Sequence, residues 1–180
     1  MSGTIDRRSA ARNVLIVGLG NPDRGDDGIG AMVAKALAGR LPSDIALLAR
    51  SGDVMSLIED WAGYSALICV DAAAPMGTPG RIHRIDLTRD ELPAETLFTS
   101  THAFGLADAV RLARTLQLAP QEIVVYAVEG GNFEVGAPMS PEVAAATGEV
   151  TDLVVGEVGR LSNGRPSRLP PRPPAPPPRW

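Results

Sequence analysis

Two adjacent aspartates, Asp26 and Asp27, lie in a glycine-rich loop directly after an apolar run at residues 14–17. Glycines in such a loop allow a partner to approach the main chain closely. A phosphate-binding loop would need free backbone amides and a nearby Lys or Arg. Two carboxylates in this position indicate instead a cation, a proton, or an interaction with the dipole of the helix that follows.

The glycines of this loop do not form a dinucleotide-binding fingerprint. Gly18 and Gly20 have the spacing of the first two glycines of that motif, but the next one, Gly25, follows only after five residues. The fingerprint requires a step of three residues at this point. We therefore assign no nucleotide site to the loop.

A third acidic residue and a histidine extend the candidate site. Asp71 ends an apolar run at residues 66–71, and His102 precedes a helical pattern. Two carboxylates and one imidazole on separate loops could hold a metal ion with open coordination positions. Two structural alternatives stay open, since aspartates at strand ends accept hydrogen bonds from the next turn and lone histidines pack or cap helices. Asp27 and Asp71 could also act as an acid–base pair without a metal.

Other catalytic arrangements fit the sequence less well. Adjacent side chains such as Asp26 and Asp27 diverge along the chain and rarely share one proton, as an aspartic-protease pair must. Ser100 and Thr101 precede His102 and suggest a hydroxyl nucleophile. No Gly-x-Ser-x-Gly motif surrounds these hydroxyls, so we do not assign them a nucleophilic role.

Strand and helix patterns alternate along the chain. The expected strands are residues 14–17, 45–49, 66–71, 81–87 and 122–128, and the expected helices are residues 28–41, 54–61, 103–116 and 140–161. This alternation predicts a three-layer α/β/α sandwich around a twisted, mainly parallel sheet, with 81–87 as an edge strand. Ligands of such sheets bind at the carboxyl ends of the strands. Asp27 and Asp71 lie at these ends, and His102 could face the same crevice.

The length of 180 residues indicates a single domain. We expect a flexible N-terminus over residues 1–12, an α/β domain over 13–162 and a disordered Pro/Arg-rich tail over 163–180. The single cysteine, Cys69, excludes an internal disulfide and fits a reducing compartment.

The charge distribution argues against nucleic acid as a partner. The formal net charge is −4, and the last 16 residues carry four arginines and no acid, which leaves −8 on the rest of the chain. No segment has the length of a membrane span, and the first 13 residues lack the apolar stretch of a signal peptide. We expect a cytoplasmic protein without a membrane partner, and a monomer, because no long exposed apolar stripe is evident.

Four short motifs follow one another in a specific order. They are Gly18-Leu19-Gly20-Asn21 with Asp26-Asp27-Gly28-Ile29-Gly30, then Leu67-Ile68-Cys69-Val70-Asp71-Ala72, then Ser100-Thr101-His102-Ala103-Phe104-Gly105-Leu106-Ala107-Asp108, and finally residues 129–141, which end in Pro138-Met139-Ser140-Pro141. In this combination the chain resembles the hydrogenase maturation endopeptidases, which process the large subunit of nickel–iron hydrogenases. The resemblance covers residues 14–154, nearly the whole expected domain.

The resemblance implies a mixed α/β fold and one hydrolytic cut. The cut removes a short C-terminal extension from the precursor of the hydrogenase large subunit after nickel has been inserted. The metal-binding positions of the family correspond to Asp27, Asp71 and His102, and we assign catalysis to the same residues. Asp27 stands where relatives often have Glu and keeps the oxygen donor. Substrate binding is assigned to Gly20, Asn21, Asp26 and Gly28 of the first motif.

The ligand types implied by the resemblance suit a metal that the substrate supplies. Two carboxylates and one imidazole form a modest site without a thiolate, and the HExxH helix of many zinc proteases is absent. We therefore expect Asp27, Asp71 and His102 to contact nickel already held by the precursor. The nickel would act as the recognition signal, with Lewis-acid catalysis as a further option.

Two other functions stay open from the sequence. A non-catalytic chaperone that checks the metal of the same precursor would use the same three ligands. The opening residues 18–22, Gly-Leu-Gly-Asn-Pro, are also similar to those of peptidyl-tRNA hydrolases. Those enzymes need a histidine shortly after this motif and a basic face for tRNA, whereas this chain has Asp26-Asp27 and an acidic domain.

Overall fold

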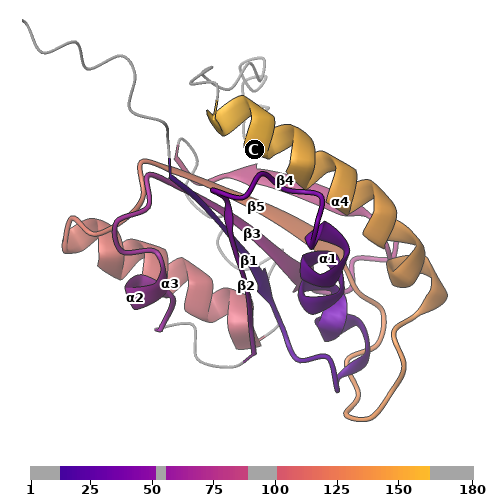
Figure 1. Ribbon diagram of the computed structural model, residues 1–180. Coiled ribbons are helices and arrows are strands. Elements are labelled where there is room, and N and C mark those ends of the chain that lie inside the picture. Colours follow the sequence, from indigo (N-terminus) through magenta and orange to yellow (C-terminus); the bar gives the residue numbers. More distant parts are fainter. Residues whose placement is uncertain (1–12, 52–55, 89–100, 163–180) are drawn as a thin grey trace, which may run out of the picture.

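A computed structural model describes residues 13–51, 56–88 and 101–162, with the backbone alone for residues 101–105. The expected flexible N-terminus at residues 1–12 and the expected disordered tail at residues 163–180 lie outside these ranges. The residues between them form the layered arrangement shown in Figure 1. No helix within the described ranges is long and apolar enough to cross a bilayer.

The apolar runs of the sequence form one five-stranded sheet with the strand order β2-β1-β3-β5-β4. Four strands are parallel, and β4 pairs antiparallel with β5 at one edge. Strands β1 and β3 are buried along their whole length, which explains their nearly continuous apolar sequences. The strands are β1 (Val14–Leu19), β2 (Ala46–Arg50), β3 (Ala66–Ala73), β4 (Ile82–Asp86) and β5 (Glu122–Glu129).

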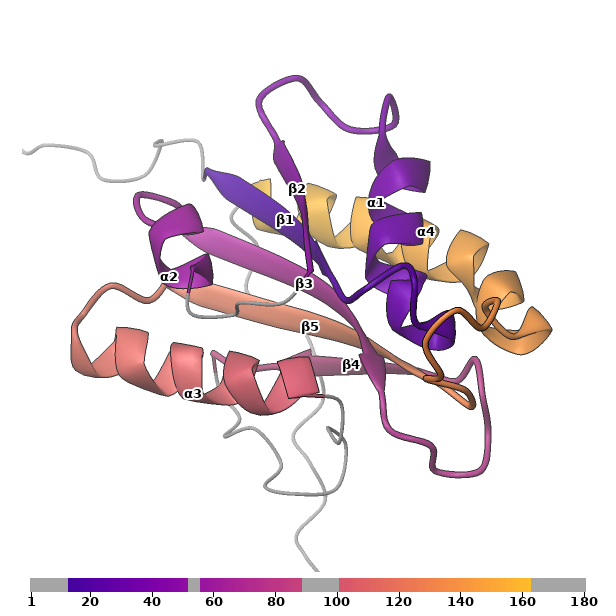
Figure 2. The same cartoon turned by 90° about the horizontal axis from the view of Figure 1, so that it is seen from below.

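Helices cover both faces of the sheet. Figures 1 and 2 show α1 and α4 on one face and α2 and α3 on the other. The helices are α1 (Ile29–Leu37), α2 (Leu57–Asp60), α3 (Thr101–Thr115) and α4 (Pro141–Ser162), and the short 3-10 helix η1 (Gly25–Gly28) precedes α1. The predicted three-layer α/β/α sandwich around a mainly parallel sheet with an edge strand is thereby confirmed, and the structure adds that the edge strand is antiparallel.

Each face of the sheet carries its own hydrophobic core. In β3, Leu67 and Cys69 belong to the core beneath α2 and α3, whereas Ile68 and Val70 belong to the core beneath α1 and α4. This alternation follows from the period of two along a strand. Burial of one large aliphatic side chain contributes about 1.5–3 kcal/mol, so the two cores hold the strand ends in fixed positions.

Most element boundaries differ from the sequence prediction by a residue or two, and two of the differences bear on the fold around the site. The helix expected over residues 28–41 ends at Leu37, because Ala38 leaves the helical conformation and Gly39 has a φ of +81°. Asp71 was expected to end its strand, but β3 continues to Ala73. The longer strand pairs with β5 as far as Glu129. Asp71 therefore lies inside the sheet instead of in the following turn.

Candidate active site

The carboxyl ends of β1 and β3 meet at the switch point of the sheet. The connection that follows β1 passes through α1 to β2 on one side, and β3 lies on the other side of β1. Ligands of doubly wound sheets bind at this point, because the diverging connections leave a crevice. Asp27 lies in the loop after β1, and Asp71 lies near the end of β3. The fold thus brings the two predicted carboxylates to the same crevice.

Close backbone packing determines where the Asp27 loop lies. A Cβ atom on Gly30 would lie 2.1 Å from the carbonyl oxygen of Leu19 and 2.6 Å from that of Val70. Gly20 has a φ of +115°, and its Cβ atom would lie 1.8 Å from the carbonyl oxygen of Asp27. Glycine is therefore required at both positions. The first turn of α1 rests directly on β1 and β3, which places Asp27 beside the end of β3.

Asp71 is a buried carboxylate with one oxygen left without a partner. The residue is 0% exposed, and its Oδ1 accepts a hydrogen bond of 2.8 Å from the backbone N–H of Ala72. Its Oδ2 is also buried and accepts no hydrogen bond from the residues that the structure describes. Burial, together with the negative charge of Asp27, raises the pKa of Asp71 to about 7, although the N–H of Ala72 opposes the shift. A buried oxygen of this kind favours a cation or a proton as its partner.

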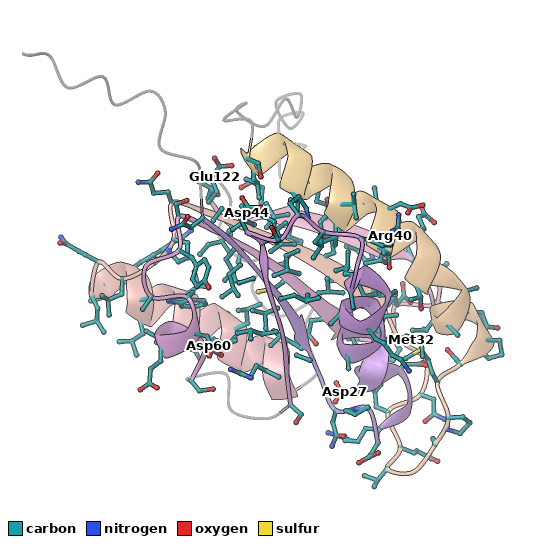
Figure 3. The ribbon with its side chains drawn as sticks, viewed as in Figure 1. Asp27, Met32, Arg40, Asp44, Asp60 and Glu122 are labelled. Carbon is teal, nitrogen blue, oxygen red and sulfur yellow. The ribbon has the colours of Figure 1, made fainter. Side chains whose placement is uncertain are left out.

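Asp27 is buried within its own loop and is electrostatically coupled to Asp71. Its Oδ2 accepts a hydrogen bond of 2.9 Å from the backbone N–H of Asn21, and the residue is 1% exposed. Its charge contributes to the raised pKa of Asp71. In Figure 3, Asp27 lies on the loop that leads from β1 into α1. The structure thus brings Asp27 and Asp71 together at one edge of the sheet.

Asp26 connects two loops that are far apart in the sequence. Its Oδ2 accepts hydrogen bonds from the N–H groups of Gly131 and Asn132 at 2.7 and 2.9 Å, and its Oδ1 accepts one from Ser140 at 2.6 Å. Burial raises the pKa of Asp26, but these three amides outweigh burial and the net shift of the pKa is downward. The side chain is fully buried and its two oxygens are occupied by the main chain.

The other residues assigned to substrate binding lie in the same loop. Asn21 is partly buried, and its side-chain Oδ1 accepts a hydrogen bond from the N–H of Asp23. Gly28 packs against Pro22, since a Cβ atom on Gly28 would lie 2.9 Å from the Cα of that proline. Substrate binding by Gly20, Asn21, Asp26 and Gly28 stays a prediction.

His102 is the second residue of α3, whose backbone begins at Thr101. Its side chain lies outside the described part of the structure, so the third expected ligand is placed only by its helix. Within the residues whose side chains are described, no group of three or more His, Cys, Asp and Glu residues could hold a metal ion. Asp27 and Asp71 are the expected ligands that the structure does bring together.

Glu129 is a buried acid at this edge to which the sequence analysis gave no role. It is 1% exposed at the end of β5, and its Oε1 accepts hydrogen bonds of 2.6 Å from the N–H groups of Met76 and Thr78. These bonds fix the loop after β3. An acid that closes an apolar strand, the same signal that identified Asp71, could have revealed Glu129 as well.

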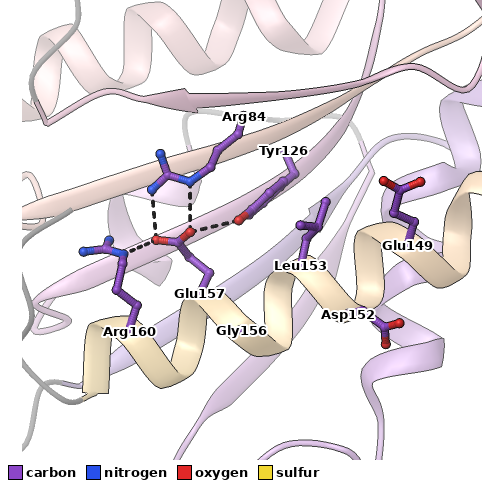
Figure 4. Close-up of a pocket in the computed structure, with 8 residues that line it drawn as sticks. All are labelled: Arg84, Tyr126, Glu149, Asp152, Leu153, Gly156, Glu157 and Arg160. Atoms are coloured by element: carbon purple, nitrogen blue, oxygen red, sulfur yellow. Dashed lines mark hydrogen bonds and ion pairs between the residues drawn. The ribbon is translucent and has the colours of Figure 1, made fainter. Parts of the chain in front are cut away.

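A hollow of about 710 Å³ lies on α4, away from the carboxyl ends of β1 and β3. Figure 4 shows Arg84, Tyr126 and Arg160 of its lining in contact with Glu157. Glu157 accepts hydrogen bonds from Arg84 at 2.9 and 3.0 Å and from the hydroxyl of Tyr126 at 2.9 Å, and it also pairs with Arg160. These contacts join α4 to β4 and β5, so we assign this hollow a structural role.

Comparison with known proteins identifies the family. The family model described as hydrogenase maturation protease matches residues 35–157. The hydrogenase 2 maturation protease of Escherichia coli K12 is 31% identical over 138 residues, which cover 73% of this chain and 82% of that protein. The chain belongs to the hydrogenase maturation protease family. It is therefore a peptide-bond hydrolase. The family match includes Asp71 and His102 but begins after Asp27.

Solved structures of hydrogenase maturation proteases share the fold. The endopeptidase HybD of Escherichia coli superimposes with a TM-score of 0.70 at 24% identity, over 82% of this chain and 93% of that one. HybD of Thermococcus kodakarensis gives a TM-score of 0.67 at 24% identity, over 81% and 99% of the two chains. The α/β sandwich described above is thus the fold found in this family.

Proposed function

We propose that this protein removes the C-terminal extension from the precursor of a nickel–iron hydrogenase large subunit, and that it acts on the precursor that already holds nickel. The observation that carries the proposal is the buried Oδ2 of Asp71, which has no hydrogen-bond partner in the described part of the chain and belongs to a carboxylate on which the charge of Asp27 acts. A cation brought by the substrate would satisfy this oxygen. Membership of the hydrogenase maturation protease family supports the substrate class.

The donor types fit nickel as part of the substrate. Carboxylate oxygens and an imidazole bind first-row divalent metals, but without a thiolate the site has modest affinity. Asp27 and Asp71 supply the oxygens, and His102 at the start of α3 is the proposed nitrogen ligand. A modest site releases the metal with the product, so the nickel stays with the matured subunit. The protein needs no nucleic acid and no membrane for this reaction, and a monomer in the cytoplasm would suffice.

The carboxylates also suit the proton movements of hydrolysis. Water adds its hydroxyl to the carbonyl carbon of the peptide bond, and a proton passes to the departing amine. A carboxyl whose pKa is about 7 exchanges protons readily at neutral pH. Without a bound cation, Asp71 can therefore accept a proton from water. Nickel held by the precursor would instead bind the carboxylates, and the chemistry it would supply is polarisation of the carbonyl group. In the alternative mechanism, Asp27 and Asp71 act as an acid–base pair without a metal. Cleavage of a precursor that holds no nickel would favour this alternative.

Cleavage rates of three variants on the nickel-loaded precursor test the roles proposed for Asp27, Asp71 and His102. Asp27→Asn, Asp71→Asn and His102→Ala should each reduce cleavage by more than about a hundredfold, because each removes a ligand from a small site. Asp108→Asn serves as the control, since Asp108 pairs with Arg111 on the exposed side of α3. Cleavage at the wild-type rate by any of the three variants would remove that residue from the site.

A further inference from the structure

An open groove of about 330 Å³ begins beside the Asp26–Asp27 loop and runs along α1. The loop before α1, the outer face of α1 and the segment before α4 form its walls. Its lining is mostly apolar or glycine, and the side chains that matter for the argument are Pro22, Met32, Lys35, Pro138 and Met139. Gly28, which directly follows Asp27, is part of the wall. The groove therefore begins at the residue next to Asp27.

Lys35 is the single charged side chain among the residues that line this groove. It forms no ion pair with any residue that the structure describes, and it is the only lysine among the 180 residues. Met32 is 40% exposed, and Figure 3 shows it on α1 close to the loop that carries Asp27. An adaptable thioether and two prolines make a surface for apolar side chains. The ammonium group adds a site for one carboxylate.

The length of the groove sets the length of chain that it can bind. Lys35 lies seven positions after Gly28, which corresponds to about 10 Å along a helix. An extended peptide covers this distance with about three residues. A chain that leaves the active site through the groove would thus bring its third or fourth residue to Lys35.

We propose that the groove binds the extension of the precursor just beyond the bond that is cut, with an Asp or Glu side chain of the extension paired with Lys35. This rests on the proposed function, because the residues before the bond then hold the nickel. The part after the bond is left as an extended chain. Its apolar residues lie against Met32, Pro138 and Met139, and the ion pair with Lys35 fixes its register. The groove thereby selects extensions that carry an acid three or four residues after the cut.

Kinetics on the nickel-loaded precursor test the ion pair. Lys35→Glu should raise KM about tenfold with little change in kcat, whereas Lys35→Arg, which keeps the charge, should stay near wild type. A precursor whose acid at this position is changed to Lys should show the opposite preference and be rescued by Lys35→Glu. A merely structural role of Lys35 would give no such rescue. An unchanged KM for Lys35→Glu, with the wild type active, overturns the groove assignment and leaves the proposed function standing.

A chemical readout does not depend on cleavage. A carbodiimide couples an amine to a carboxylate in contact with it, and Lys35 is the only side-chain amine of the protein. In a mixture with the precursor, mass spectrometry should find Lys35 joined to the extension, whether or not the extension has been cut. The control is the double variant Lys35→Arg with Arg111→Lys, which moves the amine to exposed α3 on the opposite face of the sheet. Coupling of Lys35 elsewhere, or none at all, overturns the proposal.

Discussion

At the scale of single residues, the adjacent aspartates Asp26 and Asp27 have different surroundings. Both oxygens of Asp26 accept hydrogen bonds from backbone amides of a distant loop. Asp27 accepts a hydrogen bond from the backbone N–H of Asn21, and its negative charge contributes to the raised pKa of Asp71. Asp26 therefore fixes the loop that presents Asp27, and of the two adjacent aspartates it is Asp27 whose charge acts on Asp71.

Replacement of Asp26 by Asn should destabilise the protein. The amide –NH2 group would face a backbone N–H donor, and a buried donor without an acceptor costs about 1–3 kcal/mol. We expect urea unfolding at pH 7 to show that the free energy of unfolding of Asp26→Asn is lower than that of the wild type by this amount. Asp23→Asn is the matched control, because Asp23 is exposed three residues away in the same loop.

The stability that is lost on replacement of Asp26 by Asn should also depend on pH. The folded-state pKa of Asp26 is lowered, so its stabilisation is present above the unfolded-state pKa and disappears as the pH falls through the folded value. The difference between wild type and Asp26→Asn should therefore shrink on acidification. A difference that stays constant from pH 7 to pH 3 would contradict this role of the ionised carboxylate.

Asp71 should have the opposite effect on stability. Its pKa rises from 3.8 to about 7 on folding, so its contribution is fully present below pH 4 and is lost as the pH rises to 7. Asp71→Asn avoids this loss. We expect the variant to be more stable than wild type at pH 8 by at most about 4 kcal/mol, with a smaller difference at pH 5. Unfolding with a chelator present measures this, and a gain independent of pH would exclude the raised pKa.

The sequence predicted that Asp27 and Asp71 lie at the same edge of the sheet, but it did not predict that Asp26 holds the loop in place. The pairing follows from a general rule, since parallel strands end at one edge of the sheet and ligands bind at its switch point. The task of Asp26 depends on Gly131, a residue 105 positions away, and no local pattern reveals such a contact. The position of Glu129 at the end of an apolar strand could have revealed a buried acid, but not its partners Met76 and Thr78, which lie in another loop.

At the scale of elements, α1 determines where the active-site loop lies. The helix approaches β1 and β3 so closely that Gly30 has no room for a side chain. The apolar spacing predicted this helix, but it placed the helix end four residues too late. The pattern continues to Leu41, whereas the backbone turns at Ala38 and Gly39. Side-chain periodicity reports which face is buried and not where the backbone leaves the helix.

Gly30→Ala should therefore disturb both stability and activity. The new methyl group would meet backbone atoms of Leu19 and Val70, which cannot rotate away. Overpacking of this kind costs about 1–3 kcal/mol or more, and a shift of α1 would move Asp27 away from Asp71. Thermal unfolding and precursor cleavage should both be impaired.

The control for Gly30→Ala is Gly148→Ala in α4. A Cβ atom there meets nothing within 4 Å, and alanine favours a helix, so we expect a gain of about 0.5–1 kcal/mol with unchanged cleavage. A loss of similar size in both variants would show that the close approach at Gly30 is not the cause.

At the scale of the whole molecule, the alternation of strand and helix patterns was enough to predict the layers. The strand order was not predictable in this way, because β5 inserts between β3 and β4 through long-range pairing. That insertion extends β3 to Ala73 and buries Asp71 inside the sheet. The burial raises the pKa of Asp71 and leaves its Oδ2 without a partner among the described residues, and the proposed contact with nickel depends on this oxygen.

The most direct test of this account is the intact mass of the cognate large-subunit precursor after incubation with the protein. Nickel-loaded and nickel-free precursor are compared under the same conditions. We predict the loss of one C-terminal peptide from the loaded form alone. Cleavage of both forms would contradict recognition of nickel and favour an acid–base pair of Asp27 and Asp71, and cleavage of neither would contradict the processing role itself.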